Sequence, residues 1–234
     1  MNSGSVKSVK KLTCDERRAA IIDAVRRVFA EKGFDGTTTR ELAAAAGVSE
    51  ALLFKHFPNK EALYSAMQIS CCNERDVDRI EQLKALEPSA STLVLLVHFF
   101  VSRVLVEPEC NPEKAIHARL MLRSLTENGE FVRLCLKGLP SELNQWMAAS
   151  LQAAVAAGDA YDGPVQPSLG CWLTHHLAMM IKAYKLPTTP VMDYKLPGEK
   201  VVEQTVWYTL RGMGLKDEAI RRYYNPRALA LFAE

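Results

Sequence analysis

Apolar residues recur along this chain at intervals of three and four positions, the spacing that places side chains on one face of an α-helix. The run from Ile21 to Phe29 shows this spacing near the start of the chain. A capping box precedes the run, since the Thr13 hydroxyl and the Glu16 carboxylate can satisfy free amides at a helix start. Gly33 can end the helix in a left-handed conformation. The pattern therefore predicts a first helix of about 18 residues.

The same signals continue along the rest of the chain. A second capping box lies at residues 38–41, Ser49 can cap a short helix, and Pro88 ends a long one. The predicted helices after the first span about residues 38–47, 49–57, 60–87, 91–107, 111–129, 130–137, 140–157, 168–185, 199–212 and 217–224. Neither a strand pair nor an internal repeat emerges, so the predicted fold is all-α.

The composition is that of an ordinary soluble globular protein, because 48% of the 234 residues are hydrophobic and 24% are charged. The polar, basic start lacks the apolar core of a signal peptide. The most apolar run, residues 93–101, is far shorter than the ~20 residues that span a bilayer. We therefore expect a cytoplasmic protein in which this run forms a buried helix.

The cysteines and histidines give no metal or redox signature. Six cysteines, at positions 14, 71, 72, 110, 135 and 171, show neither CxxC spacing nor a disulfide framework. Isolated cysteines of this kind usually act as small buried hydrophobes in a reducing compartment. Cys71 and Cys72 are adjacent, so this pair remains open as a redox candidate. No HxxxH spacing is present, and we expect neither a metal nor a cofactor.

The charge is distributed unevenly. The formal net charge is +2, but the first 66 residues carry more Lys and Arg than Asp and Glu, whereas the remainder is slightly acidic. A basic N-terminal region on a neutral-to-acidic body is compatible with a polyanionic partner for that region. A solvated surface would give the same pattern, so charge alone does not decide the function.

The segment from residue 40 to residue 57 has the composition of a helix-turn-helix. Alanines at 43–46 allow close approach of a second helix, Gly47 permits a tight turn, and Ser49 can cap the helix that follows. In such units the first part of the second helix enters the major groove of DNA. The residues that this places on or near DNA are Ser49, Glu50, Ala51, Leu52, Lys55 and His56. The alternative is a pair of core helices joined by a glycine turn.

The stretch GFDGTTTRELAAAAGVSEALLFKHFPNKEAL, residues 33–63, resembles the N-terminal domain of TetR-type (tetracycline-repressor-like) transcriptional regulators. The resemblance covers about residues 15–66. It implies a three-helix helix-turn-helix DNA-binding domain at 13–66, after a disordered basic tail at 1–12. A larger, divergent helical domain for effector binding and dimerisation would follow at 67–234.

The resemblance also implies roles for single residues. Thr37 and Thr38 would hold phosphates at the start of the second helix, and Arg40 would reach the backbone or a base edge. Thr39 belongs to the same set of DNA-binding residues. Lys55, His56 and Lys60 would contact phosphates, while Ser49, Glu50, Ala51 and Leu52 would read bases. The alternatives are plain solvation for the two lysines and a capping or packing role for His56.

Three positions depart from the family pattern. Ala51 stands where the family often has Gly, and Phe54 stands where Tyr is usual and cannot make a phenolic phosphate contact. Leu52 stands where a small or hydroxyl residue is common, which makes contact with a thymine methyl group plausible.

The resemblance further implies a homodimer that reads a palindromic double-stranded operator, paired through the last two major helices. The apolar residues proposed for that interface are Cys171, Trp172, Leu177, Met180, Ile181, Tyr184, Val202, Val206, Trp207 and Leu210. Each of these residues could equally face the subunit's own core.

The resemblance also implies a largely apolar small-molecule effector, whose binding would release the protein from its operator. The candidate pocket residues are Phe99, Phe100, His117, Met121, Trp146, His175 and Met179, each of which could instead be plain core. A constitutive regulator, an activator, a helical enzyme and a scaffold remain alternatives, although no catalytic motif such as GxSxG or HExxH is present.

Overall fold

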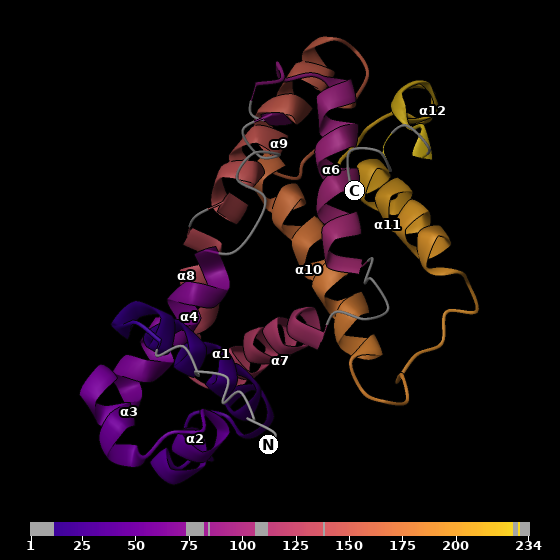
Figure 1. Cartoon of the computed structure of the whole chain (residues 1–234). Coiled ribbons are helices and arrows are strands. Elements are labelled where there is room, and N and C mark those ends of the chain that lie inside the picture. Colours follow the sequence, from indigo (N-terminus) through magenta and orange to yellow (C-terminus); the bar gives the residue numbers. More distant parts are fainter. Residues whose placement is uncertain are drawn as a thin grey trace, which may run out of the picture. The chain divides into compact units, whose positions relative to one another are not determined.

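A computed structural model of the chain describes residues 12–73, 82–83, 85–105, 112–137, 139–226 and 229; of residues 71–73, 112–114 and 139 it describes only the backbone (Figure 1). The chain divides into two compact units, residues 1–73 and 74–234. The boundary predicted at residues 66 and 67 falls inside a helix. Of the predicted N-terminal tail, residues 1–12, only Leu12 is described. The side chains of the redox candidates Cys71 and Cys72 also lie outside the described part.

Four helices build the N-terminal unit: α1 (Cys14–Lys32), α2 (Thr39–Ala45), α3 (Glu50–His56) and α4 (Lys60–Asn73). Both predicted capping boxes are present, with the side chains of Thr13 and Glu16 capping α1 and those of Thr38 and Glu41 capping α2. Helix α1 packs against α2 and α4. The large side chains enclosed between these helices are Ile21, Val25, Phe29, Leu42, Leu53, Phe57, Leu63 and Met67.

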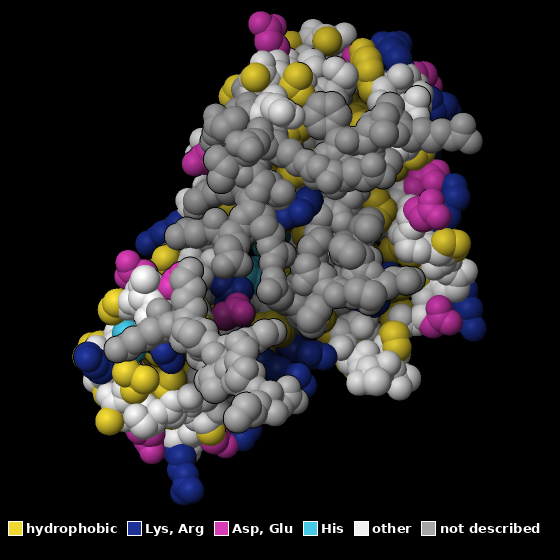
Figure 2. Space-filling model, in the orientation of Figure 1, with side chains coloured by type: hydrophobic (Ala, Val, Ile, Leu, Met, Phe, Trp, Pro, Cys, Tyr) yellow, Lys and Arg dark blue, Asp and Glu magenta, His cyan; other side chains and the backbone are white. Residues whose placement is uncertain are grey.

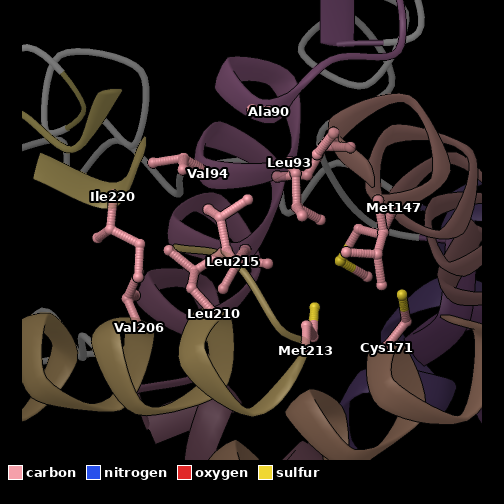
Figure 3. Close-up of a cluster of buried hydrophobic side chains, with 14 of the residues drawn as sticks. Ala90, Leu93, Val94, Met147, Cys171, Val206, Leu210, Met213, Leu215 and Ile220 are labelled. Carbon is pink, nitrogen blue, oxygen red and sulfur yellow. The ribbon is translucent and has the colours of Figure 1, made fainter. Parts of the chain in front are cut away.

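Seven helices of the C-terminal unit are described: α6 (Ala90–Leu105), α7 (Pro112–Thr126), α8 (Glu130–Lys137), α9 (Leu139–Ala156), α10 (Pro167–Lys185), α11 (Gly198–Gly212) and α12 (Asp217–Tyr223). Helix α6, which contains the apolar run at 93–101, packs against α9, α10, α11 and α12. Its side chains meet those of α9, α10 and α11 in one buried apolar cluster (Figure 3). The prediction that this run forms a buried helix is confirmed.

The fold is all-α, as predicted. An isolated antiparallel bridge between Ala160 and Leu215 is the one β-type pairing among the described residues. The predicted long helix at 60–87 is helical from Lys60 to Asn73, while residues 85–89 are not helical; most of the range between lies outside the described part. No helix in the portion of the chain that the structure describes is long and apolar enough to cross a membrane.

One cysteine differs from the prediction. Cys14 and Cys171 are free thiols, but Cys135 forms a disulfide bond. Cysteine spacing in the sequence did not signal this bond, because a disulfide depends on which helices meet in space.

Candidate nucleic-acid interface

A turn of four residues, 46–49, joins α2 to α3. Gly47 has a φ of 63°, which only glycine adopts at little cost. The amides of Gly47 and Val48 donate to the carbonyls of Ala44 and Ala43 at 3.1 and 3.0 Å, which satisfies the end of α2. The Ser49 hydroxyl then accepts the Leu52 amide at 3.2 Å and caps α3. The turn chemistry predicted for this segment is therefore present.

Helix α3 has one inward and one outward face. Leu53 is only 2% exposed, and Phe57 beyond the end of the helix is also buried. Glu50, Ala51, Phe54 and Lys55 are exposed, whereas Leu52 and His56 are partly buried. The exposed face therefore contains Glu50, Ala51 and Lys55, which the sequence assigned to DNA contact, together with Phe54.

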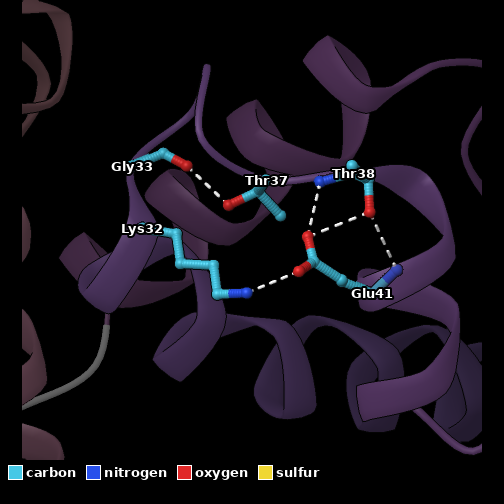
Figure 4. Close-up of polar contacts among 5 residues, drawn as sticks. All are labelled: Lys32, Gly33, Thr37, Thr38 and Glu41. Atoms are coloured by element: carbon cyan, nitrogen blue, oxygen red, sulfur yellow. Dashed lines mark hydrogen bonds and ion pairs between the residues drawn. The ribbon is translucent and has the colours of Figure 1, made fainter.

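The start of α2 is held by a small polar network (Figure 4). The Glu41 carboxylate accepts the Thr38 amide and the Thr38 hydroxyl, each at 2.9 Å, and pairs with the Lys32 ammonium. These bonds lower the pKa of Glu41 to about 2, and the largest contribution comes from Lys32, followed by Thr38. The network fixes how the chain enters α2 from the loop after α1.

Thr37 corrects one sequence expectation. Its hydroxyl donates to the Gly33 carbonyl at 2.6 Å, its amide donates to the Phe34 carbonyl at 3.3 Å, and the residue is 2% exposed. Both of its donors are therefore used inside the unit, so Thr37 shapes the loop between α1 and α2 and has no donor to offer a phosphate.

Lys60 is held by contacts inside the same unit. Its ammonium group donates to the carbonyls of Phe34 and Thr37 at 2.9 and 3.0 Å and lies 4.2 Å from the centre of the Phe34 ring. A cation in this environment is committed to carbonyls and an aromatic face. Lys60 therefore links the start of α4 to the loop before α2. An ammonium group has three donors, of which two are used here, so its contact with phosphate stays a prediction.

The end of α3 is anchored to α1. The Arg18 guanidinium donates to the His56 carbonyl at 2.6 Å and lies 4.2 Å from the centre of the Phe57 ring. The His56 Nδ1 atom lies 3.8 Å from the Cys14 sulfur. These contacts place His56 partly in a packing role, one of the alternatives open at the sequence level, and they fix the axis of α3.

Two cations beside α3 stay open to a partner. Within the described residues, neither Arg40 near the start of α2 nor Lys55 on α3 has an ion-pair or hydrogen-bond partner, and both are exposed. Lys and Arg side chains project from the surface in the region of α2 and α3 (Figure 2). Thr39 and Glu50 are bonded to each other, from the Thr39 hydroxyl to the Glu50 carboxylate at 2.7 Å. The exposed face therefore carries two open cations and one held anion.

The candidate effector residues of the C-terminal unit divide into separate groups. Phe99 and Met121 are buried, and the other five are partly buried. Phe100 and Trp172 both lie against the His175 ring, with ring centres 5.5 and 5.9 Å away. The His117 ring instead contacts Phe131 at 5.5 Å. The structure thus brings Phe100 and His175 together, while the ring beside His117 is that of Phe131.

Several buried polar atoms in this unit have no hydrogen-bond partner among the residues that the structure describes. They include His175 Nδ1, Trp146 Nε1, His98 Nδ1 and the Ser150 hydroxyl. Burial, together with the neighbouring His176, lowers the pKa of His175 to about 4, and burial also lowers the pKa of His98. The sequence pattern did not single out Ser150 or His98. A small polar residue on an otherwise apolar helix face was the only available signal.

The predicted dimer residues are only partly at the surface. Cys171, Val202, Val206 and Leu210 are buried in the unit's own core, which corrects that part of the prediction (Figure 3). Met180 and Tyr184 are exposed, and Trp172, Leu177, Ile181 and Trp207 are partly buried. The exposed apolar residues Leu169, Leu173 and Tyr208 were missed. The signal that would have found the first two is their place on one face of α10, where steps of four, seven and four residues lead from Leu169 through Leu173 and Met180 to Tyr184.

Part of the N-terminal unit is similar to a known family of proteins. Residues 21–67 match the family model of bacterial regulatory proteins of the tetR family. The HTH-type transcriptional repressor Rv1474c of Mycobacterium tuberculosis is 47% identical over 51 residues, which are 22% of this chain and 27% of the relative. The HTH-type transcriptional regulator RutR of Escherichia coli K12 is 39% identical over 69 residues, 29% of this chain and 32% of the relative. The chain thus matches about a third or less of the length of these relatives.

Solved structures extend the likeness over most of the chain. A tetR-family regulatory protein from Rhodococcus RHA1 has a TM-score of 0.60 at 18% identity, covering 86% of this chain and 99% of its own. AibR, crystallised with isovaleryl coenzyme A and operator DNA, has a TM-score of 0.56 at 19% identity, covering 82% and 97%. At these identities the likeness shows a shared fold.

Proposed function

We propose that this chain, a TetR-family protein by its N-terminal unit, is a cytoplasmic transcriptional repressor that binds a palindromic DNA operator as a homodimer and is released by a small molecule. The observation that carries the proposal is the exposed face of α3. It combines Lys55 with residues that have no packing task, and it stands next to the open guanidinium of Arg40. A short helix with a charged outer face and a buried inner face can lie in a major groove.

Dimerisation is the second part of the proposal. One helix-turn-helix contacts few bases, so such proteins pair and read half-sites one helical turn apart. Leu169, Leu173, Met180 and Tyr184 form an exposed apolar stripe along α10, which we call the α10 stripe. A second copy that presents the same stripe would cover it in a two-fold interface. Tyr208 on α11 offers further exposed aromatic surface.

Release by a small molecule is the third part. Unpartnered polar atoms in an apolar interior suit a ligand that brings its own hydrogen-bonding groups, since each unpaired group costs free energy. His175 Nδ1 and Trp146 Nε1 are such atoms. The complex of AibR with isovaleryl coenzyme A makes acyl-CoA thioesters a first class of candidate effectors to test. We propose no catalytic role for the chain.

DNA binding is tested by footprinting the region upstream of the chain's own gene and by titrating the affinity against salt. Each phosphate neutralised by a cation steepens the slope of log affinity against log salt by about 0.9. Lys55→Ala removes one open cation from each subunit, so we expect the slope of the dimer to become shallower by about 2. Affinity should fall for all sequences alike.

Arg27→Ala is the matched control, because Arg27 is an exposed cation of the same unit whose guanidinium already pairs with Glu31 at 2.7 Å. We expect its slope to equal that of the wild type. A folded, dimeric wild-type protein that retards no duplex even at low salt would contradict the proposal. Candidate acyl-CoA thioesters are then added to the protein–DNA complex, and release is measured by fluorescence anisotropy.

A further inference from the structure

Glu50 is an anion on the face that the proposed function turns toward DNA. It is the first residue of α3, it is exposed, and it is the sole acidic residue of that helix. Anions near phosphates are unfavourable, so an acidic residue at this position needs a compensating use. Its Oε2 atom accepts a hydrogen bond from the Thr39 hydroxyl at 2.7 Å.

The bond between Thr39 and Glu50 joins the first residue of α2 to the first residue of α3. It spans the turn and ties the carboxylate to a helix that does not enter the groove. A side chain held in one orientation loses less conformational entropy when it binds. Because Thr39 occupies Oε2, the second carboxylate oxygen, Oε1, remains available to a donor from outside.

A carboxylate can only accept hydrogen bonds. In the major groove, cytosine presents the N4 amino donor, guanine presents two acceptors, and thymine presents one acceptor and a methyl group. Adenine presents its donor beside the N7 acceptor. A carboxylate therefore finds its best match in cytosine and is repelled most strongly by guanine.

The residues next to Glu50 offer less discrimination among the four bases. Ala51 and Leu52 carry no polar side-chain atom, and the Ser49 hydroxyl accepts the Leu52 amide as the cap of the helix. Leu52 can add apolar contact with a thymine methyl group. Glu50 is therefore the residue on the first turn of α3 whose chemistry separates the four bases most sharply.

We propose that Glu50 selects cytosine at one position of each operator half-site, and that Thr39 is the positioning residue that aims its carboxylate. The inference rests on the proposed function as a DNA-binding repressor and specifies its sequence preference. The carboxylate acts in two ways: it accepts from the cytosine amino group, and its charge weakens binding wherever that amino group is absent.

The test is selection of bound oligonucleotides from a library of randomised half-sites, followed by affinity measurements at one fixed salt concentration. The wild type should enrich cytosine at one position per half-site. Replacing that cytosine by guanine should lower affinity at least tenfold per half-site, the order of one good base contact. Glu50→Ala should lose this preference and bind non-operator DNA more tightly. Glu50→Gln should shift the preferred base to adenine, because glutamine pairs with adenine N6 and N7.

Thr39 is tested in the same selection. Thr39→Val keeps the shape of the side chain but removes the hydroxyl, so the preference for cytosine should weaken several-fold. Thr39→Ser keeps the hydroxyl and should retain the wild-type preference. Glu61→Gln is the control, since Glu61 is an exposed acid on the first turn of α4 and its removal should leave the preference unchanged. Thermal melts confirm that each variant is folded.

The outcomes separate the inference from the proposed function. A wild type that binds DNA with the expected salt slope, while Glu50→Ala retains the same base preference, overturns the role of Glu50 alone. If Thr39→Val selects the same sites as strongly as the wild type, the positioning role of Thr39 is wrong. A wild type that binds no duplex overturns the proposed function and the inference together.

Discussion

At the scale of single residues, the decisive information is the partner of each side chain. Thr37 and Lys60 have the residue types of phosphate contacts, but the Thr37 hydroxyl donates to Gly33 and the Lys60 ammonium donates to two carbonyls. Those partners lie 4 to 26 positions away in sequence, and nothing in the local pattern marks them. Arg40 and Lys55 are also expected phosphate or DNA contacts, and these two cations have no partner in the described part of the chain. Sequence could therefore propose the set of contact residues but could not sort it.

His175 gives a prediction in pH. Burial lowers its pKa to about 4 in the folded protein, against 6.5 as the ordinary value. Between these values the unfolded chain binds the proton and the folded chain does not, so stability falls as pH drops from 6.5 towards 4. At 1.36 kcal/mol per unit, this amounts to about 3 kcal/mol. His175→Gln should remove that part of the pH dependence, measured as the free energy of unfolding by urea at pH 7.5 and pH 4.5.

His98 serves as the internal reference for this measurement, because burial lowers its pKa as well and it titrates in both proteins. The wild type and His175→Gln should therefore differ only in the loss that His175 contributes. Equal losses of stability in the two proteins between pH 7.5 and pH 4.5 would contradict the assignment.

At the scale of elements, local chemistry predicted helix starts well. The sequence predicts three helix caps correctly: the capping boxes at Thr13 and Thr38 and the cap at Ser49. They can be predicted because a cap involves residues within three positions of each other. The sequence does not predict which residues of α10 and α11 face the core and which face a partner. Periodicity identifies an apolar face without identifying what covers it, so Val206 and Leu210 were expected at a dimer interface and instead lie in the core of their own unit.

The Lys60 link between α4 and the loop before α2 gives a prediction at this scale. Lys60→Met keeps the aliphatic stem but leaves the carbonyls of Phe34 and Thr37 without their donor. Hydrogen bonds to a charged group contribute about 1.5–3 kcal/mol, so the free energy of unfolding should fall by that order. The measurement is chemical denaturation followed by circular dichroism. Lys55→Met is the control, because the Lys55 ammonium has no partner within the described residues.

DNA binding by the Lys60→Met variant distinguishes the two roles considered for this lysine. If Lys60 acts only as a link, the salt slope of the folded variant should match that of the wild type, unlike the shallower slope expected for Lys55→Ala. A stable Lys60→Met protein with a shallower slope would confirm Lys60 as a phosphate contact.

At the scale of the whole molecule, two compact units divide the proposed tasks. The helices and the turn of the N-terminal unit could be predicted because their caps are local, whereas the partners of Thr37 and Lys60 could not. The C-terminal unit could be predicted only as a set of helices, since its partner surface and its unpartnered polar atoms depend on packing between distant segments. Ser150 was missed for that reason, whereas the spacing of Leu169 and Leu173 along α10 was a signal present in the sequence.

The α10 stripe gives the prediction for the assembled protein. Leu173 is 50% exposed, so Leu173→Glu should leave the subunit folded while placing a charge inside the proposed interface. Sedimentation should then show a monomer at concentrations where the wild type is a dimer, and operator affinity should fall with it. Leu125→Glu is the matched control, since Leu125 on α7 is the same residue type at 64% exposure. A dimeric Leu173→Glu protein would contradict the proposed interface.

The exposed stripe on α10 has a consequence for how such a chain would respond to its own abundance. Where subunits are scarce relative to their pairing constant, the amount of paired protein rises with the square of the amount synthesised. Doubling the gene dosage would then raise promoter occupancy nearly fourfold until the sites fill. Four side chains on one helix would thus set the protein concentration at which the operator sites become occupied.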